Sequence, residues 1–248
     1  MENNWFGYPM ETGTFDGMDT VCVFPKGERC GYLAVKTEYW GAFPEAVELS
    51  LLEKGFCLCS IQNTDRWGTE ENIHRKAAFI RHVCRTYGLR EKVVPVGMSC
   101  GGLIAIQLAA RYPELIACLY LDAPVLNYLS CPCGLGAAEP LDGGNGIGEM
   151  LGALKLDGIS QLIGYRDMPL DKLPSLIRHR IPVVMVAGGQ DHTVPYSENG
   201  HYLEQAYRAS GIDFALYLKP QCDHHPHGLA DNRPVIDFIV RHCPAEAL

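Results

Sequence analysis

The sequence predicts an α/β fold, in which a mostly parallel central sheet carries helices on both faces. Short apolar runs rich in Val, Ile and Leu alternate along the chain with segments of helical periodicity, which is typical of such sheets. With 248 residues, of which 47% are hydrophobic and 20% charged, the chain is long enough to bury one large core. The sequence contains no internal repeat that would indicate a repeat architecture instead.

The expected elements follow one another in order. Pro44 suits the first turn of a helix that ends at Lys54, before Gly55, and a longer helix should stop at Gly88. Strands are expected at residues 21–24, 31–35, 56–61, 92–96, 116–121, 181–187 and 214–218, and helices at 44–54, 70–87, 101–112 and 233–243.

Residues 125–178 interrupt this alternation. They contain a Gly-rich stretch at 142–148 and two short helix-like pieces near 148–156 and 170–178. Because a loop this long inside a compact domain usually has a function, we expect one domain over residues 1–248 with a small cap inserted at about 125–178. A surface excursion without function is the alternative interpretation.

Composition excludes several classes of protein. The first residues lack the basic region and apolar core of a signal peptide, and no apolar stretch reaches membrane-spanning length, so a cytoplasmic protein without a membrane partner is expected. A net charge of −8 without clusters of Lys and Arg argues against nucleic acid as a partner. The eleven cysteines form no C-x-x-C pair and should be reduced. No G-x-G-x-x-G follows the first strand, and no cofactor is expected.

The most informative motif is Gly97-Met98-Ser99-Cys100-Gly101, which fits the pattern G-x-S-x-G. It follows an apolar run and opens a helical segment. A serine on such a sharp strand-to-helix turn is held out from the backbone, and the flanking glycines avoid clashes that side chains would cause. We therefore expect Ser99 to be a nucleophile. Cys100 begins the helix, and its backbone amide matters more than its thiol.

A serine nucleophile of this kind needs an acid and then a base later in the chain. Asp191 follows the strand expected at 181–187, on a loop that two glycines open, and is the expected acid. Asp122, at the end of the strand before it, is the alternative acid, and would otherwise brace the floor of the site.

Three histidines follow the last expected strand. A neutral imidazole is the natural acceptor of a serine proton near pH 7. His224 comes first after the strand and is the expected base, with His225 and His227 as alternatives. Their spacing could also suggest zinc. However, four residues of one loop rarely surround an ion without a distant ligand, so no metal site is expected.

An oxyanion formed at Ser99 should be held by two backbone N–H groups. One belongs to Cys100, and the other is expected at Thr37 or Glu38, in the segment that follows the strand at 31–35. Three further side chains are expected to line the substrate pocket, although the two aromatic ones could equally pack elsewhere: Tyr39, Trp40 and His192.

The serine motif, the acid loop at residues 190–195 and the histidine loop together resemble the α/β-hydrolase superfamily, over nearly the whole chain. Residues 122–125, 194–199 and 224–229 are also similar to a bacterial subgroup of esterase-type hydrolases that is often associated with carbohydrate esters. The His-His-Pro-His run is the most specific of these marks. Where that subgroup has Gly-x-Gly and Trp-Arg, this sequence has Gln221 and Asp223, and Val35 and Lys36.

These residues and the resemblance lead us to expect a serine hydrolase. It would cleave a small-molecule carboxylic ester, short-acyl or carbohydrate-linked, through an acyl-enzyme on Ser99. A peptidase, lactonase or thioesterase is the alternative, because the same triad serves each leaving group. A non-catalytic binding protein on this fold is a third hypothesis. A serine in the motif excludes a dehalogenase, which needs a carboxylate there. The oligomeric state cannot be predicted.

Overall fold

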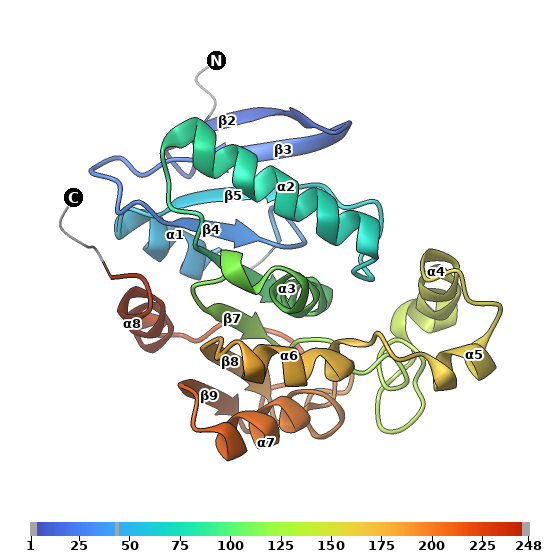
Figure 1. Cartoon of the computed structure of the whole chain (residues 1–248). Helices are drawn as coiled ribbons and strands as arrows, with labels where there is room; N and C mark the ends of the chain where they lie inside the picture. Colours follow the sequence, from blue (N-terminus) through green and yellow to red (C-terminus); the bar gives the residue numbers. More distant parts are fainter. Residues whose placement is uncertain (1–3, 43–44, 245–248) are drawn as a thin grey trace.

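A nine-stranded sheet forms the centre of the computed structural model, which describes residues 4–42 and 45–244 (Figure 1). Its strands lie in the order β1-β2-β3-β5-β4-β6-β7-β8-β9. The parallel part consists of β4 (Leu33–Lys36), β5 (Cys57–Ile61), β6 (Val93–Met98), β7 (Leu119–Asp122), β8 (Val183–Gly188) and β9 (Phe214–Lys219). The antiparallel edge consists of β1 (Asn4–Trp5), β2 (Tyr8–Phe15) and β3 (Met18–Val23).

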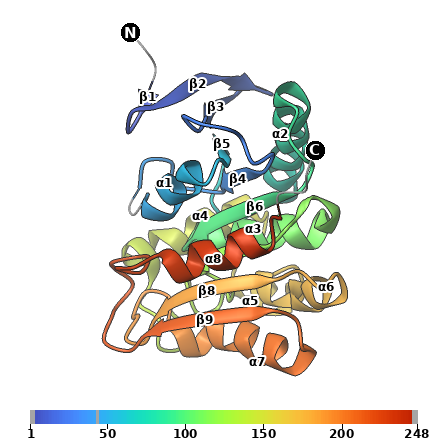
Figure 2. The same ribbon diagram turned by 90° about the vertical axis from the view of Figure 1, so that its left-hand side faces the viewer.

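Helices cover both faces of the sheet, as the alternating pattern predicts (Figures 1 and 2). One face carries α1 (Ala46–Glu53) and α8 (Arg233–Arg241), which pack against each other and onto the middle strands. The other face carries α2 (Glu70–Tyr87), α3 (Cys100–Arg111), α6 (Leu173–Arg178) and α7 (Gly200–Ser210). Pro44, at which the first helix was expected to start, lies outside the described residues.

Buried apolar residues account for this layering. All of the side chains of β6 and β8 are buried, because a parallel strand covered on both faces has no side that meets water. On α2 the residues Ile73, Ala77 and Ile80 recur at helical spacing and face the sheet. That helix ends at Gly88, whose φ of 65° is the left-handed conformation that glycine adopts without strain.

The hairpin of β1 and β2 was not predicted. Most residues of β2 are exposed, and its sequence has no alternation of apolar and polar residues that would mark a half-buried strand. Its turn to β3 is at Asp16-Gly17, where both φ angles are positive, and this dipeptide is a known hairpin signal. The turn was therefore readable from the sequence, whereas the strand before it was not.

The segment at 125–178 divides into two parts. Helices α4 (Asn145–Ala153) and α5 (Ile159–Gly164) stand apart from the sheet, beyond the ends of its parallel strands (Figure 1). Arg66, which precedes α2, holds this part through Asp142 and Glu149 at 2.6 and 2.7 Å. Helix α6 instead belongs to the helix layer, between α3 and α7. The projecting part is therefore shorter than the expected insertion.

None of the helices in the described ranges is both long and apolar enough to cross a membrane. The cysteines of those ranges are free thiols, and most of them are buried in the core.

Candidate active site

Ser99 lies on the sharp turn between β6 and α3. Its backbone has φ 52° and ψ −119°, a conformation that costs energy for a residue with a side chain. Its amide donates to the carbonyl oxygen of Asp122 at 2.9 Å, which ties the turn to the end of the neighbouring strand β7. The strained turn is thus held in place by the sheet, and it presents the serine hydroxyl to the pocket beyond the strand ends.

The glycines around Ser99 are required by close packing. A Cβ atom added to Gly97 would lie 2.5 Å from the carbonyl oxygen of Gly101. One added to Gly102 would lie 2.5 Å from the Cβ of Pro124. Both distances are far below van der Waals contact. The turn therefore needs the glycines that the sequence motif supplies.

His224 joins Ser99 to Asp191. The Nε2 atom of His224 is 3.2 Å from the hydroxyl oxygen of Ser99, and its Nδ1 atom is 2.8 Å from Oδ2 of Asp191. Asp191 follows β8, and His224 lies on the loop after β9. A carboxylate only accepts hydrogen bonds, so the Nδ1–H of His224 donates to it and Nε2 is left with its lone pair toward Ser99. This is the arrangement in which an imidazole can take a proton from a serine.

Asp191 is itself fixed by the backbone. Its Oδ1 atom accepts hydrogen bonds from the amides of Thr193 and Val194, at 3.0 and 2.6 Å. The side chain is almost entirely buried. Asp191 therefore holds the His224 ring in one orientation.

Asp122, the alternative acid, pairs with a different histidine. Its Oδ1 atom is 2.9 Å from Nδ1 of His227, and its Oδ2 atom accepts from the hydroxyl of Tyr120 at 2.9 Å and the amide of Gly228 at 2.5 Å. The structure thus contains two carboxylate–imidazole pairs side by side. Sequence reasoning missed the second pair, because nothing along the chain indicates that residues 105 positions apart meet.

His225 lies beside both pairs and makes no hydrogen bond to either. Its ring centroid is 5.1 Å from that of His224 and 4.7 Å from that of His227. Burial, followed by the neighbouring imidazoles of His227 and His224, lowers the pKa of His225 below its usual value. His225 therefore adds a neutral ring to the pocket near neutral pH.

Asp223 joins the acid loop to the histidine loop. Its Oδ1 atom accepts from the amides of His192 and His224, at 2.9 and 2.7 Å, and its Oδ2 atom is 3.1 Å from Nδ1 of His192. These contacts, first of all the amide of His192, lower the pKa of Asp223 to about 2. His192 was expected in the substrate pocket. It is instead largely exposed, beside Asp223, and does not line the pocket at Ser99.

The oxyanion site differs from the expectation at one of its two candidate positions. The amide of Thr37 continues the β4–β6 ladder by donating to the carbonyl oxygen of Val96 at 3.1 Å, so it is not available to a substrate. The amide of Glu38 has no acceptor among the described residues, and it lies close to Gly101 in the serine turn. Cys100 is the first residue of α3, where amides have no partner within the helix. Glu38 and Cys100 are thus the two amides left for an oxyanion.

The thiol of Cys100 is not a competing nucleophile. It is buried, and burial raises its pKa to about 11. Because the thiolate is the reactive form, this thiol is inert near neutral pH.

A cavity of about 510 Å³ opens in front of Ser99. Leu141 brings a side chain from the projecting segment into it. No Asp, Glu, Lys or Arg is found among the described residues that line it, which are Tyr39, Ala42, Met98, Ser99, Leu141, Thr193, His224, His225 and His227. Trp40, expected here, packs instead on Trp5, with ring centroids 5.2 Å apart.

Lys36 is kept away from this cavity. Its side chain is fully buried, 2.9 Å from Glu48, and it donates to the carbonyl oxygen of Ala42 at 3.1 Å. Lys36 therefore stabilises the loop that contains Glu38 and Tyr39, through its bond to Ala42. Its charge is paired with Glu48 and is not available to a substrate.

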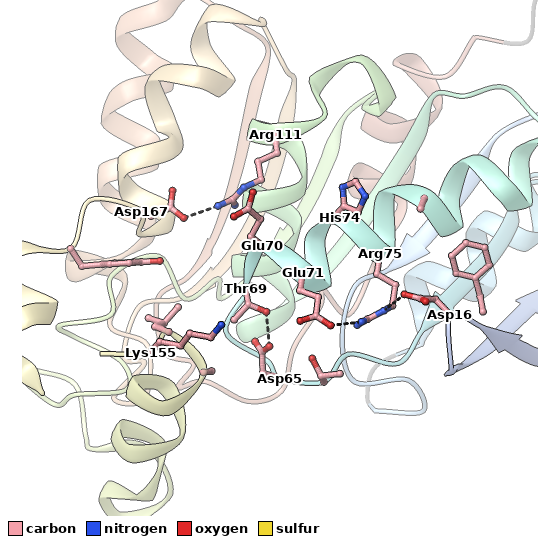
Figure 3. Close-up of a pocket in the computed structure, with 17 residues that line it drawn as sticks. Asp16, Asp65, Thr69, Glu70, Glu71, His74, Arg75, Arg111, Lys155 and Asp167 are labelled. Atoms are coloured by element: carbon pink, nitrogen blue, oxygen red, sulfur yellow. Dashed lines mark hydrogen bonds and ion pairs between the residues drawn. The ribbon is translucent and has the colours of Figure 1, made fainter. Parts of the chain in front are cut away.

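A second, larger cavity of about 960 Å³ lies at the start of α2 (Figure 3). Most of its charged side chains are already paired, as Arg111 is with Asp167 at 2.6 Å and Arg75 with Asp16 at 2.9 Å. Among the described residues that line it there is no serine or cysteine beside a histidine. The groups arranged for nucleophilic chemistry are therefore at the cavity in front of Ser99.

Comparisons with known proteins agree with this architecture. A sequence model described as "alpha/beta hydrolase fold" matches residues 59–136, which include Ser99. An acylaminoacyl peptidase from Pyrococcus horikoshii superposes with a TM-score of 0.70 at 13% identity, over 88% of this chain and 38% of that one. A putative dipeptidyl aminopeptidase IV from Bacteroides ovatus gives 0.69 at 17% identity, over 94% and 35%. A puromycin hydrolase mutant gives 0.66 at 16% identity, over 96% and 38%.

These likenesses establish the fold. The chain has the α/β-hydrolase fold, as the sequence predicts. It spans less than two-fifths of the length of these solved proteins. A comparison with curated proteins gave no match.

Proposed function

We propose that the chain is a serine hydrolase with Ser99 as nucleophile, His224 as base and Asp191 as the acid that orients it. The observation that carries the proposal is the continuous line of contacts from the Ser99 hydroxyl to His224 at 3.2 Å and from His224 to Asp191 at 2.8 Å. The hydroxyl lies at the floor of a cavity, where a substrate carbonyl can approach it.

The proposed reaction proceeds in two halves. Ser99 Oγ attacks the carbonyl carbon while its proton passes to Nε2 of His224, and the amides of Cys100 and Glu38 hold the oxyanion. The imidazolium of His224, stabilised by Asp191, then protonates the leaving oxygen, and the acyl group stays on Ser99. Water, deprotonated by His224, releases the acid and restores the hydroxyl.

The lining of the cavity supports a neutral, short-acyl ester as substrate. Its described walls are apolar side chains, the phenol of Tyr39, the hydroxyls of Ser99 and Thr193, and three imidazoles. They include no Asp, Glu, Lys or Arg that would hold an ionised group. A volume of about 510 Å³, shared by the acyl group and the alcohol, suits a short acyl chain. The resemblance of the histidine loop to carbohydrate-ester hydrolases supports an acylated sugar as the alcohol part.

A peptidase is the second candidate, because two of the three solved proteins named above are described as an acylaminoacyl peptidase and a putative dipeptidyl aminopeptidase. The triad geometry serves an amide as well as an ester. A panel of acetylated sugars and p-nitrophenyl esters, run beside aminoacyl p-nitroanilides, separates the two. Turnover of anilides only would contradict the esterase proposal.

Replacing the nucleophile tests the mechanism. Ser99→Ala is expected to lower kcat for p-nitrophenyl acetate by roughly 10⁴- to 10⁶-fold, because no other group can carry the acyl intermediate. Ser197→Ala, at an exposed serine near the acid loop, is the matched control and should keep wild-type turnover.

Labelling gives an independent readout of the same proposal. A fluorophosphonate probe should modify the wild-type chain at Ser99 and leave Ser99→Ala unlabelled. Wild-type turnover by Ser99→Ala would refute the mechanism, and no labelling of the wild-type chain would favour a non-catalytic binding protein.

A further inference from the structure

Three imidazole rings meet at one side of the cavity. The ring centroids of His224, His225 and His227 are between 4.7 and 5.1 Å apart, and the rings stand nearly perpendicular to one another. One ligand atom of each ring lies within 4.8 Å of those of the other two. Hydrolysis by the proposed triad uses only one of the three, so the other two need another explanation.

Carboxylates orient two of these rings in the same way. Asp191 accepts from Nδ1 of His224 and Asp122 accepts from Nδ1 of His227, so the lone pairs of both rings are on Nε2. The His227 side chain is only 6% exposed, yet its Nε2 atom has no hydrogen-bond partner among the described residues. Histidines that bind metal ions characteristically donate their other N–H to a carboxylate, which fixes the ring and raises its basicity.

The third ring is free to complete such a site. The imidazole of His225 makes no hydrogen bond among the described residues, and it is the most exposed of the three. Metal–nitrogen distances of about 2.0–2.1 Å place tetrahedral ligand atoms roughly 3.4 Å apart. Ligand atoms that lie as far apart as 4.8 Å must therefore approach by more than an ångström. Rotation of the His225 ring supplies this for the pairs that include His225, and small shifts of the other two rings supply the rest.

We propose that His224, His225 and His227 form a binding site for a divalent transition-metal ion, and that the bound ion inhibits the hydrolase. Three neutral imidazoles are a donor set for Zn²⁺, Ni²⁺ and Cu²⁺ rather than for Mg²⁺ or Ca²⁺. The remaining coordination position faces the cavity and is filled by water.

The bound ion would inhibit hydrolysis because it would occupy the Nε2 atom of His224. This inhibition rests on the proposed function, whereas binding of the ion does not. The Nε2 lone pair of His224 is the acceptor for the Ser99 proton. A lone pair that is donated to a metal ion cannot accept a proton, so Ser99 would not be activated while the ion is bound. Removal of the ion by a chelator restores the base without any change of covalent structure.

Binding is tested separately from hydrolysis, on the full chain carrying Ser99→Ala. Titration calorimetry with Zn²⁺ should show one ion per chain, and His225→Ala or His227→Ala should weaken its binding at least tenfold. Asp122→Asn, which removes the carboxylate that orients His227 and that also accepts from Tyr120 and Gly228, should weaken it by about 10- to 100-fold. His179→Ala, at an exposed histidine on the end of α6, should leave the affinity unchanged.

Because the chain has eleven cysteines, the ligand type must be read directly. The near-ultraviolet spectrum of the Co²⁺-loaded chain should lack the charge-transfer bands of thiolate ligands, and should not change in Cys222→Ser. Thiolate bands, or equal affinity in the wild-type, His225→Ala and His227→Ala backgrounds, would overturn the site.

Inhibition by the ion is tested in a separate kinetic experiment. Zn²⁺ should suppress ester hydrolysis by the wild-type chain, and EDTA should restore it. In His225→Ala the inhibition constant, measured against that variant's own uninhibited rate, should rise at least tenfold. Hydrolysis that continues with the ion bound would overturn the inhibition. If no ester is hydrolysed but the ion binds as described, the site stands and the proposed function fails.

Discussion

At the scale of single residues, the close packing around the serine turn decides where the nucleophile points. Ser99 holds a positive φ because its amide is bonded to Asp122 and because two glycines let neighbouring backbone segments approach. The same strain that costs stability holds the hydroxyl in the cavity. A substitution next to Ser99 should therefore affect folding and chemistry together.

Gly102→Ala tests this coupling. The added Cβ would meet Pro124 at 2.5 Å, so α3 must shift, and we expect a loss of roughly 1–3 kcal/mol in the free energy of unfolding together with a lower kcat. Urea unfolding and ester kinetics measure the two effects. Gly148→Ala in α4, where no atom lies within 4 Å of the added Cβ, is the control and should not destabilise the chain. Unchanged stability of Gly102→Ala would contradict the packing argument.

Single residues also show how much of the candidate site could be predicted from the sequence. The motif at Ser99 and the chain order of Asp191 and His224 predicted the three residues that the structure brings into contact. Thr37 was a wrong candidate for the oxyanion amide, because the β4–β6 ladder extends one residue beyond the strand and uses that amide. The end of a hydrogen-bonded ladder depends on the partner strand, and a single sequence does not encode it locally.

At the scale of elements, the site is built from loops that follow separate strands, and Asp223 joins two of them. It accepts hydrogen bonds from backbone amides on the acid loop and on the histidine loop. The pKa of Asp223 is lowered to about 2, below its value in an unfolded chain, so the stabilisation is present above pH 4 and is lost as the pH falls toward 2. The two loops should therefore stay joined at neutral pH.

Asp223→Ala removes the hydrogen bonds by which the Asp223 carboxylate joins these loops, and leaves the bond from the Gln190 amide to the carbonyl oxygen of Cys222. We expect kcat/KM for the ester to fall by roughly 10- to 100-fold, because an ångström of freedom at His224 misaligns it with Ser99. Hydrogen exchange of the amides at 222–228 should become faster. Asp231→Ala is the control, since exposed Arg233 is the partner of Asp231 among the described residues. Wild-type kinetics in Asp223→Ala would show that the loops are positioned by other contacts.

Helices and strands also differ in how well they can be predicted from the sequence. The parallel strands were predicted because buried strands are continuous apolar runs, as residues 93–98 and 183–188 show. The hairpin at residues 4–15 was missed because its side chains are mostly exposed, and exposed strands obey no apolar pattern. The insertion expected at about 125–178 includes α6, which lies in the helix layer between α3 and α7, a position that its short sequence does not reveal.

At the scale of the whole molecule, one buried cation makes stability depend on pH. Lys76 of α2 is fully buried, and its ammonium donates to the carbonyl oxygen of Ile61 at 3.2 Å. Burial lowers its pKa to about 8, against the weaker effects of Glu38 and Cys59, which raise it. The unfolded chain, with a lysine pKa near 10.4, holds this proton more tightly than the folded one. Stability should therefore rise as the pH increases from 8 toward 10.

Lys76→Met isolates this effect. The thioether keeps most of the side-chain volume and has no charge to desolvate, so the variant should be at least as stable as wild type at pH 7. Between pH 7 and pH 10 the wild-type chain should gain up to roughly 3 kcal/mol relative to the variant. Urea unfolding of both chains at several pH values gives the difference directly. Parallel curves would show that Lys76 does not lose its proton on folding in this range.

The end of β7 has a mechanical consequence for the molecule. The backbone oxygen of Asp122 receives the amide of Ser99, while its carboxylate holds His227 and Gly228 of the histidine loop. The nucleophile and the loop that carries the base are therefore both attached to one residue, at the end of a buried strand of the sheet. Movement of the projecting helices, or of the antiparallel edge, should then leave unchanged the distance between Ser99 and His224, on which proton transfer depends.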